Sequence, residues 1–154
     1  MTDESPESPG SLMARGTPQS LALGVDIGDG WGGGLMRAPF RADLVGDPAL
    51  GGLADGVVYT LLDQACGAAI GAAVKERAEM RGRELAMGGM ATLDFRIDYV
   101  RPARAGMDVT ARAECLRIDG EVAFVRGAAF ETDPDDPIAI AQAAFMLSGA
   151  LAGR

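Results

Sequence analysis

Residues 56–74 read GVVYTLLDQACGAAIGAAV, and this stretch decides the fold. It contains three polar side chains, those of Thr60, Asp63 and Gln64. A helix that is apolar on every side lies inside either a protein or a membrane. An uncompensated Asp63 would be costly in the middle of a membrane span, and no anchor residues flank the stretch. We therefore predict a helix in a protein core, capped by Asp55 and followed by the charged, exposed run 75–84.

The rest of the chain is rich in predicted strands. Alternating polarity and turn residues predict six of them, over residues 21–29, 31–40, 90–99, 107–118, 121–131 and 138–151. Asp119-Gly120 is then a two-residue hairpin turn, and residues 41–55 form a loop. Within 90–99, alternation places four polar residues on one face, Thr92, Asp94, Arg96 and Asp98. This order predicts an α+β fold, in which one antiparallel sheet curls around the helix and its long edge invites dimerisation.

The 154 residues are enough for one domain. Residues 1–18 are polar, acidic and rich in Ser and Pro, so we predict a disordered tail there and a single domain over residues 19–154. Because the tail lacks the apolar core of a signal peptide, we expect a cytoplasmic protein. The net charge of −8 repels phosphate backbones, so we expect no nucleic-acid partner, and we expect no membrane partner either.

The sequence contains no histidine. This excludes a Ser-His-Asp triad, a Cys-His pair, an HExxH zinc site and a His-dependent dehydratase, so acid–base chemistry must use carboxylates, Lys, Tyr, Cys or water. Cys66 and Cys115 form neither a CxxC motif nor a set of metal ligands, so we interpret both as small buried apolar residues and expect no metal. The glycines at 28, 30 and 33 have the spacing of a dinucleotide fingerprint, but no helix start follows, so we expect a turn and no cofactor there.

Asp63 requires an explanation, because a carboxylate in an apolar helix loses its hydration. It could be structural, bonded to nearby backbone or to an arginine. It could also be a general base or nucleophile whose pKa is tuned by its surroundings. Thr92, taken alone, is interpreted as a surface residue of a strand. The residues themselves leave both alternatives for Asp63 open.

Two segments resemble hotdog-fold acyl-CoA thioesterases of the phenylacetate-degradation (PaaI-like) branch. The first places Gly46-Asp47-Pro48 at the family's G-N-P, residues 53–56 (LADG) at its L-H-G-G, and Asp63 at its catalytic Asp. The second, residues 91–103, is similar to the family's strand and R-P-A turn, with Thr92 where relatives carry a Ser or Thr that helps to place a water. The resemblance covers roughly residues 20–150. It implies a hotdog fold, an antiparallel sheet of about six strands wrapped around one long central helix.

The resemblance also implies thioester hydrolysis without a metal, with CoA present only as part of the substrate. Asp63 would act as base or nucleophile across a dimer interface, and Thr92 would orient the water. Backbone N–H groups at Asp55 and Gly56 would stabilise the oxyanion. Three residues differ from the family pattern, namely Asp47 in place of Asn, Ala54 in place of His and Asp55 in place of the first Gly. If the three aspartates converge, their like charges raise at least one pKa.

The resemblance further indicates where substrate would bind. Asp47 and Ala54 adjoin the helix start, and an apolar acyl or aryl pocket would be lined by Tyr59, Leu62 and Cys66. Arg101 and Arg104 would hold the phosphates or the pantetheine arm of CoA, unless they are plain surface charge. The expected assembly is a homodimer or a dimer of dimers. The alternatives are a hotdog protein that binds acyl-CoA without turnover and a structural module that assembles through its sheet edge.

Overall fold

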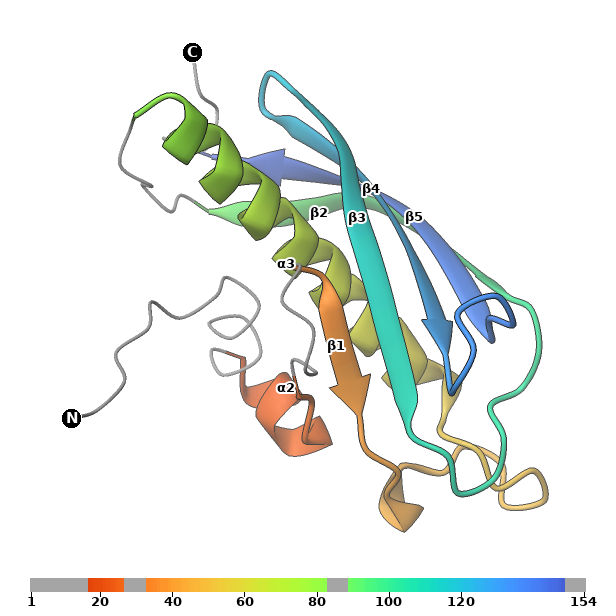
Figure 1. Cartoon of the computed structure of the whole chain (residues 1–154). Coiled ribbons are helices and arrows are strands. Elements are labelled where there is room, and N and C mark those ends of the chain that lie inside the picture. Colours follow the sequence, from red (N-terminus) through yellow and green to blue (C-terminus); the bar gives the residue numbers. More distant parts are fainter. Residues whose placement is uncertain (1–16, 27–32, 83–88, 149–154) are drawn as a thin grey trace.

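The computed structural model describes residues 17–26, 33–82 and 89–148. One long helix, α3 (Asp55–Met80), lies across one face of an antiparallel sheet whose strand order is β1-β3-β4-β5-β2 (Figure 1). The strands are β1 (Leu35–Ala38), β2 (Met90–Tyr99), β3 (Val109–Asp119), β4 (Val122–Phe130) and β5 (Ala139–Leu147). Two short helices, α2 (Pro18–Leu23) and the 3-10 helix η1 (Ala42–Leu44), precede α3. The predicted α+β hotdog architecture is confirmed.

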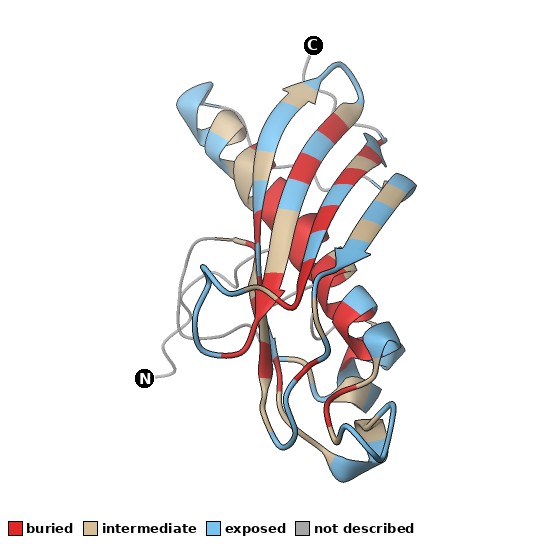
Figure 2. Ribbon diagram, turned by 90° about the vertical axis from the view of Figure 1, so that its right-hand side faces the viewer, coloured by how far each residue is buried: buried red, intermediate tan, exposed pale blue. Residues whose placement is uncertain are grey.

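The helix α3 is the centre of the core. Between Val57 and Val74 all but four of its residues are buried, and the exceptions are Tyr59, Asp63, Ala72 and Ala73. The sheet turns alternate residues toward α3, as the burial bands of Figure 2 show, and many of these inward residues are alanine. Small side chains on both elements let the sheet curl closely around the helix. By length and composition α3 could cross a membrane, but 78% of its most apolar window is buried inside the protein, as in a core helix.

A bulge in β2 changes which residues face the helix. Thr92 is opposite Phe145 of β5 and Asp94 is opposite Ala144, so Leu93 is an extra residue between them. Thr92 therefore points toward α3, on the side of Phe95, whereas Asp94 points to the outer face. The prediction that Thr92 shares a face with Asp94, Arg96 and Asp98 is wrong, because strict alternation does not survive an inserted residue.

The predicted strand over residues 21–29 is also wrong. Its described part, residues 21–26, contains the end of α2 in place of a strand. The helix begins after Thr17, and the Thr17 side chain accepts a hydrogen bond from the Ser20 amide at 3.2 Å. A threonine N-cap followed by proline is a helix start, and it overrides the short alternating pattern that follows. The described sheet consequently has five strands rather than about six. Apart from Thr17 and Pro18, the predicted tail lies outside the described residues.

Smaller differences concern the ends of elements. The N-cap of α3 is Ala54, with no side-chain hydrogen bond, and Asp55 is the first helical residue rather than the cap. Asp119 pairs with Val122, so the hairpin turn is Gly120–Glu121, with Gly120 at a φ of +58°. Residues 31–40 contribute only the strand Leu35–Ala38, and residues 138–151 contribute Ala139–Leu147 within their described part. Of the three glycines of the weak dinucleotide pattern, only Gly33 belongs to the described residues.

Candidate active site

Asp63 lies on α3 where the helix faces the edge strand β2. Tyr59 and Thr92 are exposed there, and we call this place the opening of the core. It is half-buried, and its Oδ1 accepts a hydrogen bond from the Thr92 hydroxyl, with 3.3 Å between the oxygens. Burial raises the pKa of the Asp63 carboxyl above its ordinary value, although the Thr92 hydrogen bond acts in the opposite direction. A carboxylate with a raised pKa, bonded to a hydroxyl at an opening of the core, has the properties of a general base.

An aromatic pair stands beside Asp63. Tyr59 is one helical turn before Asp63 on the same face of α3, and its ring contacts that of Phe95 from β2, with centroids 4.8 Å apart. Sequence analysis did not assign Phe95 to the site, because alternation turns it away from the polar face of the strand but does not show that it contacts Tyr59. The tilted rings form an apolar wall at the opening of the core.

The other predicted pocket residues lie deeper. Leu62 is fully buried and packs toward Gly127 of β4, which places it in the core rather than at the opening. Cys66 is fully buried one turn after Asp63, and burial, with a smaller effect of the Asp63 charge, raises the pKa of its thiol to about 12. Cys66 is therefore an apolar thiol at neutral pH. Cys115 is only half-buried, so the prediction of burial holds for Cys66 but not for Cys115.

The N-terminus of α3 borders a second part of the site. A pocket of about 560 Å³ is lined here by the loop before the helix and the turn after β2: Gly46, Asp47, Leu50, Gly52, Leu53, Ala54, Asp55, Tyr99, Val100, Arg101, Pro102 and Ala103. Val57 and Val58 donate their amides to the Ala54 carbonyl, whereas the amides of Asp55 and Gly56 have no hydrogen-bond partner within the described residues. Two amide donors at a positive helix end can stabilise an anion.

The loop before α3 is held by close backbone packing. A Cβ on Gly46 would meet the Ala54 Cα at 2.8 Å, and one on Gly52 would meet the Ala103 carbonyl oxygen at 2.0 Å. Asp47 accepts a hydrogen bond from the Ala49 amide at 2.8 Å, so its side chain shapes the loop that borders the pocket. Ala54 packs over Gly46 and adds no polar group to the site.

Asp63 lies apart from the other two aspartates, Asp47 and Asp55, which line the pocket at the start of α3. Burial, not the charge of Asp47 or Asp55, is what raises the pKa of Asp63. Asp55 and Asp63 are eight positions apart on one helix, which separates their backbones by about 12 Å along its axis. The charges of Asp47 and Asp55 are therefore not a cause of the raised pKa of Asp63 within this chain.

Arg101 and Arg104 belong to an ion-pair network. Arg101 donates to Glu131 at 2.7 and 3.2 Å and to Asp136 at 3.0 and 3.2 Å. The Arg104 amide donates to Glu131 at 2.7 Å, and its guanidinium pairs with Asp136 at 3.0 Å. This network fastens the turn after β2 to the end of β4. Sequence analysis missed Glu131, because a lone glutamate at a strand end carries no signal of burial.

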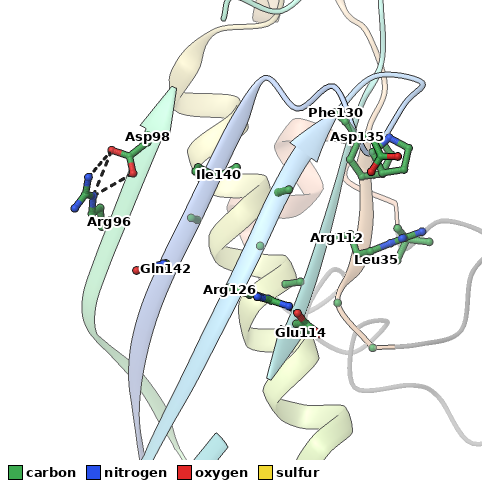
Figure 3. A pocket seen from close by; sticks show the side chains of 17 residues that line it. Leu35, Arg96, Asp98, Arg112, Glu114, Arg126, Phe130, Asp135, Ile140 and Gln142 are labelled. Carbon is green, nitrogen blue, oxygen red and sulfur yellow. Dashed lines mark hydrogen bonds and ion pairs between the residues drawn. The ribbon is translucent and has the colours of Figure 1, made fainter. Parts of the chain in front are cut away.

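A larger hollow of about 1000 Å³ lies on the outer face of the sheet, away from α3 (Figure 3). Arg96 pairs there with Asp98 at 3.1 Å, and Arg126 pairs with Glu114. None of the predicted site residues lines it. The candidate active site is therefore the opening beside Asp63 together with the pocket at the start of α3.

Comparisons with known proteins agree with the fold. A family model described as thioesterase superfamily matches residues 50–138. A structure from Pseudomonas aeruginosa shares 30% identity and a TM-score of 0.75, covering 91% of this chain and 97% of its own. A variant of the phenylacetic acid degradation protein PaaI from Thermus thermophilus is 25% identical, with a TM-score of 0.65. The match covers 86% of this chain and 100% of that protein's chain. The PaaI protein of Escherichia coli is 17% identical, with a TM-score of 0.69. The match covers 89% of this chain and 88% of that protein's chain. The sequence matches no curated protein.

Proposed function

Because the chain belongs to the thioesterase superfamily, in agreement with the predicted PaaI-like branch, we propose that it is an acyl-CoA thioesterase in which Asp63 is the general base or nucleophile. The observation that carries the proposal is the half-buried Asp63 carboxylate, with its raised pKa and its bond to Thr92, at an opening of the core. Asp63 is the one carboxylate in the buried part of α3, between Val57 and Val74, and its partner Thr92 is exposed. We expect the enzyme to act in the cytoplasm without a metal or a separate cofactor.

The proposed chemistry needs only groups of this chain and water. As a base, Asp63 removes a proton from water while the water oxygen bonds to the thioester carbon. The carbonyl electrons move to oxygen, and the amides at the start of α3 stabilise that charge. The C–S bond then breaks, the acyl group leaves as the acid, and the CoA thiolate takes up the proton. As a nucleophile, Asp63 would attack the thioester carbon and expel the CoA thiolate, which leaves an acyl anhydride. Water would then open the anhydride to give the acid and the free Asp63 carboxylate, and the proton released would go to the thiolate.

The site is shared between two subunits in this proposal. Gly56 and Asp63 are seven positions apart on α3, about 10 Å along its axis, so they cannot both act on one carbonyl group within a subunit. Within the described residues the edge strand β2 pairs only with β5, so no described strand covers its other edge. If two β2 edges pair antiparallel about a two-fold axis, the end with Thr92 meets the partner end with Tyr99. Asp63 then faces the partner subunit's Gly56.

The substrate follows from the surroundings of Asp63. The Tyr59–Phe95 wall suits an apolar acyl or aryl group. The pocket at the start of α3 would receive the thioester and the adjoining arm of CoA. Of the two arginines, Arg104 keeps the more accessible side chain, 55% exposed against 23% for Arg101. Arg104 is therefore our candidate for the CoA phosphates, while Arg101 holds the turn.

The alternative is a protein that binds acyl-CoA without hydrolysing it. The observation in its favour is the side chain of Asp55, whose negative charge stands at the helix end where the oxyanion would form. The deciding experiment measures thiol release from a panel of acyl- and aryl-CoA thioesters by wild type and by Asp63→Asn. We expect release by wild type and a loss of several orders of magnitude in the variant. Binding without release from any thioester would support the alternative.

A pair of variants at Gly56 tests the oxyanion donor. Gly56→Pro removes the amide within the first helical turn, where proline is tolerated. Gly56→Ala keeps the amide, and its added Cβ meets no atom within 4 Å. We expect Gly56→Pro to lower kcat about 10²–10³-fold and Gly56→Ala to retain the amide's contribution to kcat.

Mixing defective subunits tests whether the site is shared. Asp63→Asn and Gly56→Pro subunits, each inactive alone, would form mixed dimers in which one site carries both defects and the other carries neither. Random exchange makes about half of the dimers mixed, so about a quarter of wild-type activity should return. No recovery after demonstrated subunit exchange would show that both groups act within one chain.

A further inference from the structure

We infer that Tyr99 is a positioning residue that orients the amide of Gly56 toward the thioester oxygen, an inference that rests on the proposed function. The Tyr99 hydroxyl donates a hydrogen bond to the backbone carbonyl of Asp55, with 2.8 Å between the oxygens. That carbonyl and the Gly56 N–H belong to the same peptide group. A peptide group is planar and trans, so its C=O and N–H point in opposite directions. A hydrogen bond that fixes the carbonyl therefore fixes the direction of the amide.

Among the described residues, no other side chain forms a hydrogen bond with this peptide group. Ala54 provides no capping hydrogen bond to the start of α3, and Asp55 is exposed. A Cβ at position 56 would meet no atom of a neighbouring element within 4 Å, and glycine is the residue with the most conformational freedom. The next peptide along the helix is held separately, because the Thr60 hydroxyl donates to the Gly56 carbonyl at 2.9 Å.

The Tyr99 side chain is suited to this role. It is the last residue of β2 and faces α3, opposite Ala139 of β5, so the strand carries it to the helix start. Burial, with smaller effects of the Asp55 charge and of Tyr59, raises the pKa of the Tyr99 phenol, which therefore remains a donor at neutral pH. A donated hydrogen bond also polarises the peptide group and strengthens its N–H as a donor. Tyr99 thus acts on the oxyanion through Gly56 without touching the substrate.

The test is a double-mutant cycle on the full chain. We expect Tyr99→Phe to lower kcat about 10-fold to 100-fold, the order expected for a misplaced catalytic group, with KM changed less than about twofold. In the Gly56→Pro background, which lacks the amide, the same substitution should have no further effect on kcat. Ser148→Ala is the matched control, because Ser148 also donates a hydroxyl to a backbone carbonyl, that of Gly89 at 3.1 Å, at the opposite end of β2 from Tyr99. Ser148→Ala should leave kcat unchanged.

The possible outcomes separate this inference from the proposed function. An active wild type whose kcat is unaffected by Tyr99→Phe would overturn the role of Tyr99 and leave the thioesterase proposal intact. Equal losses from Tyr99→Phe with and without the Gly56 amide would also overturn it, since the tyrosine would then act by another route. A wild type that hydrolyses no CoA thioester would overturn the proposed function and, with it, this role.

Discussion

Replacing Glu131 by glutamine should destabilise the protein substantially. The Glu131 side chain is fully buried and is contacted by Arg101 at 2.7 Å and by the Arg104 amide at 2.7 Å. Burial alone would raise the pKa of Glu131, but the hydrogen bonds from Arg101 and from the Arg104 amide outweigh it and lower that pKa below its ordinary value. The ionised carboxylate is therefore the form that the fold stabilises.

The size of the effect follows from what the substitution leaves behind. Removing one partner of a buried ion pair costs about 3–5 kcal/mol, because the other charge stays buried. Arg101 is 23% exposed and keeps its bonds to Asp136, so we expect the lower end, about 3 kcal/mol. For a chain of this length, that corresponds to a fall in Tm of about 6–12 °C. Urea denaturation at pH 7 and fixed protein concentration measures it.

The matched control and the pH dependence make this prediction refutable. Asp136→Asn removes the exposed partner of the same arginine, which water and salt already screen, so its loss should be much smaller. A carboxyl group with a lowered folded pKa contributes stability above its unfolded pKa and loses it as pH falls through the folded value. The difference between wild type and Glu131→Gln should therefore shrink below about pH 4.5. Equal losses for the Glu131 and Asp136 variants at pH 7 would refute the reasoning.

Three further predictions concern the site itself. Thr92→Val removes the hydrogen bond that lowers the pKa of Asp63, so the acidic limb of a plot of kcat/KM against pH should move to higher pH. Asp63→Asn should raise Tm at pH 7, because the raised pKa of Asp63 means that its ionisation opposes folding. The gain should shrink as the pH falls through the folded pKa and vanish well below pH 3.8, the ordinary value of the unfolded chain, where the carboxyl is protonated in both states. In native protein Cys66, with its thiol pKa of about 12, should react with a disulfide reagent at pH 8 far more slowly than the half-buried Cys115, and equal rates would contradict the burial of Cys66.

The central helix could be predicted from the sequence because its run of apolar residues is unusually long. A run of apolar residues as long as 56–74 has few structural solutions, and one carboxylate within it stands out against them. The same contrast marked Asp63 as a residue that needs a partner or a function, whereas its role remains a proposal. The segment 21–29 was not predictable by alternation, because a capping signal of only two residues, Thr17 and Pro18, governs the backbone there.

Two features of the site depend on long-range contacts. Glu131 and Arg101 are 30 positions apart, and only the pairing of strands brings them together. The resemblance assigned Arg101 and Arg104 to CoA phosphates; both guanidinium groups also pair with Glu131 and Asp136, and Arg104 keeps the more exposed side chain. Tyr99 likewise gains its contact with Asp55 from the register of β2 against β5. Local sequence patterns carry no information about such pairs.

The bulge at Leu93 has a consequence for comparing this chain with its relatives. Because Leu93 is an extra residue, an alignment without a gap at this position would match Thr92 to a residue that points away from the helix in a relative with a regular strand. In such a relative, the hydroxyl next to the catalytic carboxylate would stand one position later in the sequence. Deleting Leu93 from this chain would restore a regular strand, with Thr92 still opposite Phe145 on the inner face and residues 95–99 in place. Which aligned position stands beside Asp63 is therefore decided by the bulge before it is decided by residue type.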